Sequence, residues 1–266
     1  YIGGGTPTSI EAEDLQRIME CISKNFDILS VREYNVEAGR ADTITFEKLK
    51  VIKDMGATRI SVNPQTLNDE VLKVIGRKHT SEQTLNAYIM ARDLGFDNIN
   101  MDLIAGLPTE TVDSFKNTLD KVILLSPESV TIHTLTLKRS SSLYLERENH
   151  FDNPVSQMIE YGMKNLMENG YNPYYLYRQK NTVENLENTG YAKNGKESFY
   201  NIFIMDETQT ILGAGCSAST KLVYSNGKIT RVHNYKFPYE YINRFDELMK
   251  KKSTETKEWR DFIATI

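Results

Sequence analysis

Cysteine, tryptophan and long apolar runs are scarce in this chain of 266 residues. Its two cysteines, Cys21 and Cys216, are too few for the disulfide framework of a small secreted protein. No apolar stretch approaches the roughly 20 residues that cross a bilayer. A large excess of one charge is also missing, because the net charge is −4 and the pI is about 5.7. The sequence therefore predicts a cytoplasmic protein with no membrane and no nucleic-acid partner.

The composition that is present is typical of a globular protein, with 39% hydrophobic and 26% charged residues. The length allows one large domain, or one domain with an additional lobe. In the first half, strand and helix patterns alternate about every 30 residues, an order that predicts right-handed βαβ units and a parallel sheet. Strands are predicted over 30–39, 59–65, 98–108 and 129–137, and helices over 8–26, 45–56, 68–76, 80–95 and 111–126. Thr8 and Glu11 have the spacing of a capping box at the first helix.

Polar and apolar residues alternate along these strands, which is unusual for parallel strands covered by helices on both faces. One face carries Glu33, Asn35, Glu37, Arg59, Ser61, Asn63, Gln65, Asn98, Asn100, Asp102, Ser129, Thr131 and His133. The other face carries Tyr34, Val36, Ile60, Val62, Ile99, Met101, Leu103, Val130 and Ile132. Helices would cover the apolar face, and the polar faces would converge on water or a ligand. The pattern favours a closed or partly closed barrel with a polar interior. A sheet with one solvent-exposed face is the alternative.

In such folds the ligand lies at the carboxyl ends of the strands. The residues expected there are the glycine run 3–5, Glu37, Gln65, Asp102 and the stretch 133–136, with Arg77 as a nearby cation. Carboxylates suit an ammonium group and a ribose diol, and an arginine suits a carboxylate. The set therefore fits an amino acid with an attached ribose. Taken singly, each residue also fits an ordinary role in a turn, a solvated loop or a hydrogen-bonded core. Their coincidence at equivalent strand ends is what indicates a site.

Four segments, YIGGGTPT, VEAGRADT, RISVNPQTLNDEVLKVIGRKHT and NINMDLIAGLPTET, occur in that order over residues 1–111. They resemble the radical S-adenosylmethionine (radical SAM) enzymes of the oxygen-independent coproporphyrinogen III oxidase group, most of all coproporphyrinogen dehydrogenase. The resemblance covers residues 1–140 and continues in ILGAGCSAST, residues 211–220. It implies an α/β fold, a partial (β/α) barrel similar to a TIM barrel. Here the barrel lacks its first strand and is followed by a C-terminal α+β extension.

The resemblance also implies S-adenosylmethionine bound on a [4Fe-4S] cluster. By motif, the cofactor-binding residues would be Gly4, Gly5, Thr6, Glu37, Gln65, Arg77, Asp102 and Thr136. The glycine turn and Thr6 would meet the methionyl end, and Glu37 and Gln65 would line the methionine and ribose. Arg77 would pair with the methionine carboxylate, and Asp102 would bind the ribose. Thr136 would lie near the adenine, where the family usually has another small residue, and Ser219 would be a further nucleoside contact.

One departure from the family is large. Its cluster is held by a Cys-x3-Cys-x2-Cys loop upstream of the GGGTP turn, and this chain has no such loop. Cys21 is predicted to lie on a helix, beside Met19 and Ile22, in the hydrophobic core, and Cys216 in a glycine-rich loop. Two distant cysteines cannot supply three thiolates. We therefore expect no metal ligands in this chain and cluster cysteines upstream of it. We expect a fragment, inactive alone, with barrel core over 1–150 and barrel completion plus a C-terminal lobe over 151–266.

In the second half of the chain, the residue pattern predicts a helix over 153–169 and strands over 171–179, 199–206 and 208–215. It also predicts a hairpin over 220–234 and a helix over 239–252. Asn226 and Gly227 are a strong hairpin-turn signal. Lys138, Arg139 and Arg178 could meet propionates, and the tyrosines could meet an apolar ring. Surface charges and core aromatics are the alternative for these residues.

The function implied by the resemblance is the oxygen-independent oxidative decarboxylation of coproporphyrinogen III propionates to vinyl groups, which gives protoporphyrinogen IX in haem biosynthesis. A 5′-deoxyadenosyl radical would abstract a propionate hydrogen, and loss of an electron and CO2 would leave the vinyl group. The expected partners are a tetrapyrrole substrate and an electron donor such as flavodoxin or ferredoxin, with the protein a monomer. A haem-binding chaperone of the same family, or a radical SAM enzyme with another substrate, are the alternatives.

Overall fold

The computed structural model describes residues 1–136, 154–178 and 182–264, which fall into two compact units. The first unit comprises Tyr1–Tyr200 and the second Asn201–Ile266. The domain boundary predicted between residues 150 and 151 lies outside the described residues, as do Lys138 and Arg139. Along the described part of the chain, no helix has the length and apolar content needed to cross a bilayer.

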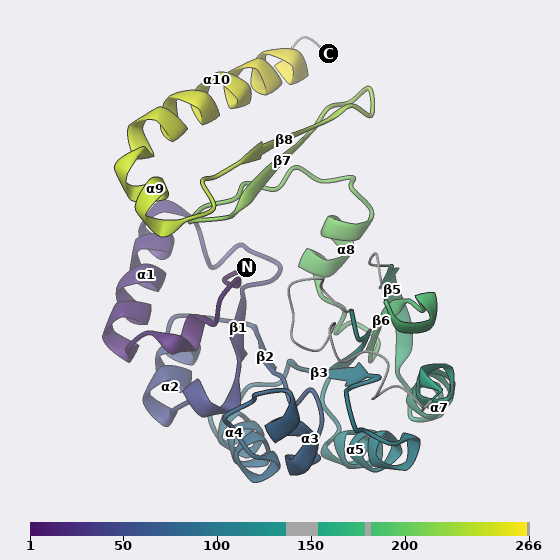
Figure 1. Ribbon diagram of the computed structural model, residues 1–266. Helices are drawn as coiled ribbons and strands as arrows, with labels where there is room; N and C mark the ends of the chain where they lie inside the picture. The colour runs from purple at the N-terminus through teal and green to yellow at the C-terminus, as the bar shows by residue number, and fades with distance from the viewer. Residues whose placement is uncertain (137–153, 179–181, 265–266) are drawn as a thin grey trace. The chain divides into compact units, whose positions relative to one another are not determined.

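The first unit is built on one six-stranded sheet (Figure 1). Its strands are β1 (Asn35–Gly39), β2 (Arg59–Val62), β3 (Ile99–Ala105), β4 (Ser129–Thr134), β5 (Asn172–Tyr177) and β6 (Asn188–Ala192), in the order β1-β2-β3-β4-β6-β5. Strands β1 to β4 are parallel, as the alternating pattern predicted. Ile2 forms a further parallel bridge to Val36, so the first residues of the chain extend the sheet beyond β1. The predicted α/β fold is confirmed, although pairing of the described strands does not close the sheet into a ring.

Strand β6 lies antiparallel between β4 and β5, and the sequence pattern did not indicate it. The segment contains Asn188 and Gly190, which are poor strand formers. Gly190 is required because the ring of Tyr175 lies where a Cβ would be placed. A tertiary contact with the neighbouring strand therefore sets this strand, rather than local propensity.

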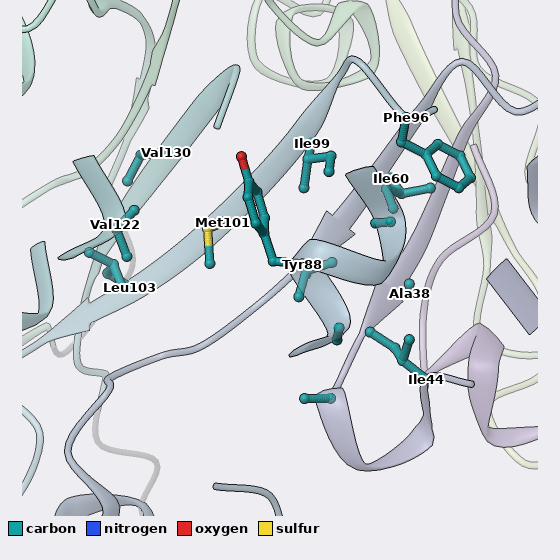
Figure 2. Packing of buried hydrophobic residues seen from close by; sticks show 14 of the residues in the cluster. Ala38, Ile44, Ile60, Tyr88, Phe96, Ile99, Met101, Leu103, Val122 and Val130 are labelled. Carbon is teal, nitrogen blue, oxygen red and sulfur yellow. The ribbon is translucent and has the colours of Figure 1, made fainter. Parts of the chain in front are cut away.

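Helices cover the apolar face of the sheet. They are α1 (Ala12–Asn25), α2 (Phe46–Asp54), α3 (Asp69–Val74), α4 (Ser81–Asp93), α5 (Val112–Leu125) and α7 (Val155–Glu168), with short 3-10 turns η1 (Pro7–Ser9), η2 (Ala41–Thr43) and η4 (Val183–Asn185). The strand residues predicted to face the helices are buried, and Figure 2 shows Ile60, Ile99, Met101 and Leu103 packed together beside Tyr88 of α4. The predicted apolar faces are therefore confirmed.

The start of α1 differs from the prediction. Thr8 is buried, and its hydroxyl donates to the carbonyl of Ala38 instead of capping a helix. The helix begins at Ala12 after Glu11, which makes no side-chain cap, so the predicted capping box is wrong. Cys21 is exposed and not in the core, because the buried side of α1 follows Leu15 and Met19.

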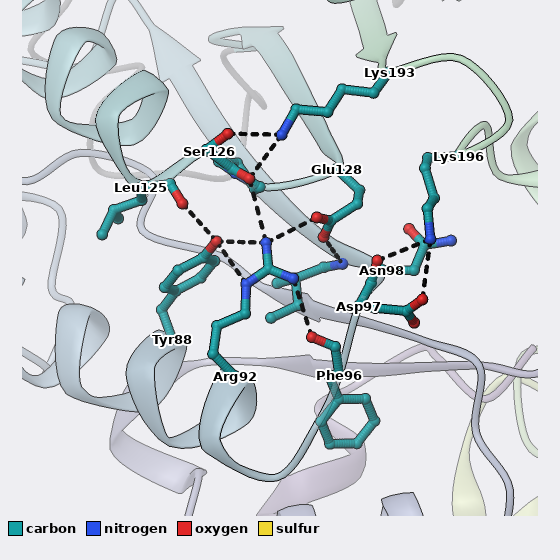
Figure 3. A network of polar contacts seen from close by, with 12 residues as sticks. Tyr88, Arg92, Phe96, Asp97, Asn98, Leu125, Ser126, Glu128, Lys193 and Lys196 are labelled. Atoms are coloured by element: carbon teal, nitrogen blue, oxygen red, sulfur yellow. Dashed lines mark hydrogen bonds and ion pairs between the residues drawn. The ribbon is translucent and has the colours of Figure 1, made fainter.

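A polar network ties the helices to the amino ends of β3 and β4 (Figure 3). The guanidinium of Arg92 on α4 donates to the Tyr88 hydroxyl, to the Phe96 carbonyl and to the carboxylate of Glu128. Glu128 also accepts the backbone N–H of Ile99 at 2.9 Å. The network lies at the strand ends opposite to those expected to bind a ligand, so we assign it a structural role.

The second unit contains a β-hairpin followed by helices. Strands β7 (Ser219–Val223) and β8 (Ile229–His233) pair antiparallel around the predicted Asn226–Gly227 turn, and α9 (Pro238–Asn243) and α10 (Phe245–Ala264) follow. The strand predicted over 208–215 is wrong: in this stretch only Ile211 forms a bridge, to Lys221.

The strand predicted over 199–206 is also wrong, since Phe199–Met205 forms helix α8. A short apolar run of this kind fits either element by pattern. The carboxylate of Glu33 accepts the backbone N–H groups of Phe199 and Tyr200, which satisfies the first amides of the helix. A residue far away in the sequence thus decides the conformation.

Gly213 in the second unit offers a test of close packing. An added Cβ would lie 2.6 Å from the carbonyl oxygen of Ser219, which is backbone and cannot rotate away. We expect Gly213→Ala to lower the free energy of unfolding of this unit by about 1–3 kcal/mol. Urea denaturation followed by fluorescence of Trp259, the single tryptophan, measures the effect. The exposed neighbour Ala214→Ser is the control, and equal stability of both variants would contradict the prediction.

Candidate functional site

The polar faces of the strands are buried inside the first unit. Side chains of Arg59, Asn100, Ser129 and Thr131 are at most 6% exposed and hydrogen-bond to one another across β2, β3 and β4. The alternative of a solvent-exposed polar face is therefore wrong, and the predicted polar interior is confirmed. This interior leads along the strands to the carboxylates near their carboxyl ends.

The glycine turn 3–5 lies beside Glu37, near the end of β1. A Cβ at Gly3 would lie 2.8 Å from Oε2 of Glu37, so glycine is what allows this approach. Gly4 has a positive φ of 88°, and a Cβ at Gly4 or Gly5 would meet no atom within 4 Å. The turn therefore leaves open space next to the Glu37 carboxylate, which itself accepts a backbone hydrogen bond from Gly4.

Two carboxylates meet at this end of the sheet, and their environments differ. Burial raises the pKa of Glu37, and the charge of Asp102 raises that pKa further. The hydrogen bond that the Tyr1 hydroxyl donates to Glu37 at 2.8 Å lowers it, but does not cancel the rise. Burial alone would raise the pKa of Asp102 too, but contacts with His133 and Asn100 outweigh it and lower that pKa. Glu37 therefore lies within electrostatic range of Asp102 and His133, and Asp102 is the more strongly ionised of the two carboxyl groups.

Gln65 follows β2 and is held against β3. Its N–H donates to the carbonyl of Asp102, and its own carbonyl accepts the N–H of Ile104, both at 2.9 Å. Its φ is 65°, in the left-handed region that non-glycine residues seldom adopt. The structure thus brings Gln65 next to Asp102, as the sequence predicted, in a conformation imposed by the sheet.

Arg77 lies in the loop after α3, beside residues that directly follow β1. The pKa of its guanidinium is lowered by burial and by the charge of Arg40, and raised by Asp42. Arg40 makes a two-point ion pair with Asp42, whereas no hydrogen bond or ion pair joins the Arg77 guanidinium to a described residue, and only its backbone N–H is bonded, to the carbonyl of Leu72. Arg77 is therefore available to an anion, although no contact links it to Glu37 or Asp102.

The remaining predicted residues are placed less closely. Thr6 precedes η1, with its methyl group 3.8 Å from where a Cβ of Gly39 would lie, at the end of β1. Thr136 follows β4 and forms a bridge with Thr182. Ser219 lies on β7 in the second unit. The assignment of all these residues to a cofactor stays a prediction.

Aromatic residues that the sequence pattern did not assign to the site also lie here. The Tyr1 ring stacks on Tyr200 with centroids 3.9 Å apart. On β5, Tyr175 and Tyr177 stack on one another, and the Tyr177 hydroxyl bonds Nδ1 of His133 at 3.2 Å. The two-residue spacing of Tyr175 and Tyr177 was a signal for a shared face, but their partners required the fold.

Comparison with known proteins bears on this arrangement. Residues 1–122 match the radical SAM superfamily. The oxygen-independent coproporphyrinogen-III oxidase-like protein HemZ of Bacillus subtilis is 48% identical over 95% of this chain and 51% of its own length. The heme chaperone HemW of Lactococcus lactis is 31% identical over 97% of this chain and 66% of its own length. The coproporphyrinogen III oxidase HemN of Escherichia coli shares the fold, with a TM-score of 0.67 at 23% identity over 92% of this chain and 56% of that structure.

Fold and matched sequence together define a radical SAM protein. Within that superfamily the chain belongs to the family of oxygen-independent coproporphyrinogen III oxidase-like proteins that includes HemZ, HemN and the HemW heme chaperones. The family predicted from the four motifs is confirmed. The chain spans between 51% and 66% of the length of these two curated relatives, HemZ of Bacillus subtilis and HemW of Lactococcus lactis.

The superfamily implies S-adenosylmethionine and a [4Fe-4S] cluster, and the residues of this chain fit the two differently. The open glycine turn and the two carboxylates fit the nucleoside and amino-acid parts of S-adenosylmethionine. The cluster does not fit, because Cys21 is exposed on α1, Cys216 lies in the second unit, and three thiolates are needed. No group of three or more His, Cys, Asp or Glu side chains in the described ranges could hold a metal ion.

Proposed function

We propose that this chain binds S-adenosylmethionine as part of a protein that acts on a tetrapyrrole. The observation that carries the proposal is the convergence of Glu37 and Asp102 beside the open glycine turn. Ionised carboxylates accept hydrogen bonds from ribose hydroxyls and from an ammonium group, and such charged bonds are strong. Gln65 lies beside them, and Arg77 is available for the methionine carboxylate.

We further propose that the reaction is the oxidative decarboxylation of coproporphyrinogen III propionates to vinyl groups. The 48% identity to HemZ, an oxidase-like relative, supports this substrate class. The bound cofactors supply the radical chemistry, and the residues of this chain bind and orient the nucleoside. The proposed partners are the tetrapyrrole and a small electron donor such as flavodoxin or ferredoxin, and the proposed state is a cytoplasmic monomer.

A haem chaperone is the second candidate function, and the 31% identity to HemW favours it. The two candidates differ in their product. Haem titration and mass spectrometry of products from coproporphyrinogen III, both with the whole cluster-loaded protein, separate them. Vinyl-containing product supports the oxidase, whereas haem binding without such product supports the chaperone.

The role of Asp102 gives the direct test of the cofactor site. We expect Asp102→Ala to weaken binding of S-adenosylmethionine by the whole, cluster-loaded protein by about 1.5–3 kcal/mol, because hydrogen bonds to a charged acceptor are lost. Isothermal titration calorimetry measures the affinity. Asp93→Ala, at the exposed end of α4, is the matched control. Unchanged affinity in Asp102→Ala would refute the assignment.

A further inference from the structure

A chain of hydrogen bonds runs through the buried polar interior to Asp102. Nη2 of Arg59 donates to Oγ of Ser129, and Ser129 Oγ donates to Oδ1 of Asn100 at 2.8 Å. Nδ2 of Asn100 then donates to Oδ1 of Asp102 at 2.7 Å. The four side chains come from three adjacent strands, and the first three are at most 6% exposed.

The direction of this chain is fixed by its first member. An arginine can only donate, so the Ser129 oxygen accepts and its single hydrogen is left for Asn100. The Asn100 carbonyl oxygen must therefore face Ser129, which turns its NH2 group toward Asp102. An asparagine flipped the other way would place an oxygen against the carboxylate and leave the serine hydrogen without its acceptor.

The second oxygen of Asp102 is confined as well. Oδ2 lies 3.8 Å from Nε2 of His133, whose Nδ1 is bonded by the Tyr177 hydroxyl. One carboxylate oxygen is thus hydrogen-bonded by Asn100 of β3, and the other lies beside His133 of β4, whose ring is bonded by Tyr177 of β5.

We infer that Asn100, Ser129 and Arg59 are positioning residues, which hold the Asp102 carboxylate ionised and oriented toward the ribose of S-adenosylmethionine. This inference rests on the proposed function for its ligand, but the chain of donors is a property of the protein alone. A site whose ligand-binding side chain is fixed by a second layer of hydrogen bonds binds more tightly, because less freedom is lost on binding.

The first test measures the Asp102 carboxyl by carbon NMR titration in this chain, with no cofactor present. Asn100 donates to the ionised form, so Asn100→Leu is expected to raise the pKa of Asp102 by about one unit. Ser129→Ala is expected to raise it by a smaller amount, and Ser129→Thr, which keeps the hydroxyl, to leave it unchanged. An unchanged pKa of Asp102 in both Asn100→Leu and Ser129→Ala would overturn the inference.

The second test measures the affinity of the whole, cluster-loaded protein for S-adenosylmethionine. We expect Ser129→Ala to raise Kd about five-fold and Ser129→Thr to restore it, with exposed Ser23→Ala as control. In the Asp102→Ala background the effect of Ser129→Ala is expected to fall below about two-fold, since residues that act through one partner are not additive. An equal effect in both backgrounds would overturn the positioning role.

The two tests also distinguish a failure of the proposed function from a failure of the inferred positioning role. If the unaltered protein does not bind S-adenosylmethionine, the proposed function fails, while the titration still decides whether the chain controls Asp102. If it binds and Asp102→Ala weakens binding but Ser129→Ala does not, the inference fails and the proposed function stands.

Discussion

Replacing Glu110 by glutamine is expected to stabilise the protein above neutral pH and to change its stability little in acid. Glu110 follows β3, is 1% exposed, and accepts hydrogen bonds from the hydroxyls of Thr66 and Ser114. Burial raises its pKa from 4.5 to about 7, and the two hydroxyl bonds only partly offset this. The folded protein therefore keeps a proton on Glu110 at pH values where the unfolded chain has lost it.

The sign follows from proton linkage. Below pH 4.5 the group is protonated in both states and contributes nothing to the pH dependence. Between pH 4.5 and about 7 the folded state binds more protons than the unfolded state, so the free energy of unfolding falls as pH rises. Above pH 7 the loss is complete and amounts to about 3 kcal/mol, at about 1.4 kcal/mol for each pKa unit.

Glutamine keeps the acceptor oxygen for Thr66 and has no charge to bury, so it resembles protonated Glu110. The stability of Glu110→Gln relative to the unaltered protein is expected to rise by about 2 kcal/mol between pH 5 and pH 8. Urea denaturation at both pH values measures this, with exposed Glu168→Gln on α7 as control. A difference that is the same at pH 5 and pH 8 would show that Glu110 is not the titrating group.

The location of Glu110 connects this prediction with the candidate site. Thr66 directly follows Gln65, and the N–H of Leu67 donates to the hydroxyl of Thr118 on α5. The hydroxyls of Thr66 and Thr118 also lie 3.3 Å apart, so two successive residues of the loop after β2 contact α5, which supports the left-handed conformation of Gln65. Strain at one site residue is balanced by buried polar contacts outside the site.

The strands of the sheet could be predicted where the alternation of apolar and polar residues is clear within the strand itself. Along β3 and β4, every second residue is apolar and packs on helices, and pairing extends over six residues in register. Strand β6 and helix α8 could not be predicted, because each depends on a distant residue. Tyr175 occupies the space above Gly190, and Glu33 satisfies the amides of α8.

In the candidate site, too, some residues could be predicted from the sequence and others could not. Glu37, Gln65 and Asp102 could be located from the sequence, because strand ends of a parallel sheet meet at one edge. The side chains that hydrogen-bond to these carboxylates could not be located from the sequence. The contacts of Tyr1 with Glu37 and of Asn100 with Asp102 depend on strand register and side-chain direction. The roles of Arg77 and Thr136 stay predictions.

Arg59→Ala is expected to be among the most destabilising substitutions in the first unit. The Arg59 side chain is 1% exposed, and Nη1 donates to Oδ1 of Asn98 at 2.7 Å and to the carbonyl of Lys196 at 2.9 Å. Nη2 donates to Ser129. Alanine removes these donors, leaves buried acceptors without a partner and opens a cavity at the amino end of the polar interior.

We expect Arg59→Ala to lower the free energy of unfolding by about 4 kcal/mol, since each buried acceptor left without its donor costs about 1–3 kcal/mol and the removed side chain leaves a cavity. Arg59→Met fills most of the space but still deprives Asn98 and Ser129 of a donor, so its loss should be intermediate. Urea denaturation followed by far-ultraviolet circular dichroism measures both variants, and exposed Arg17→Ala on α1 should stay within about 0.5 kcal/mol of the unaltered protein. Equal losses in Arg59→Ala and Arg17→Ala would mean that the buried guanidinium does not stabilise the sheet, and the orientation of Asn100 would then need another cause.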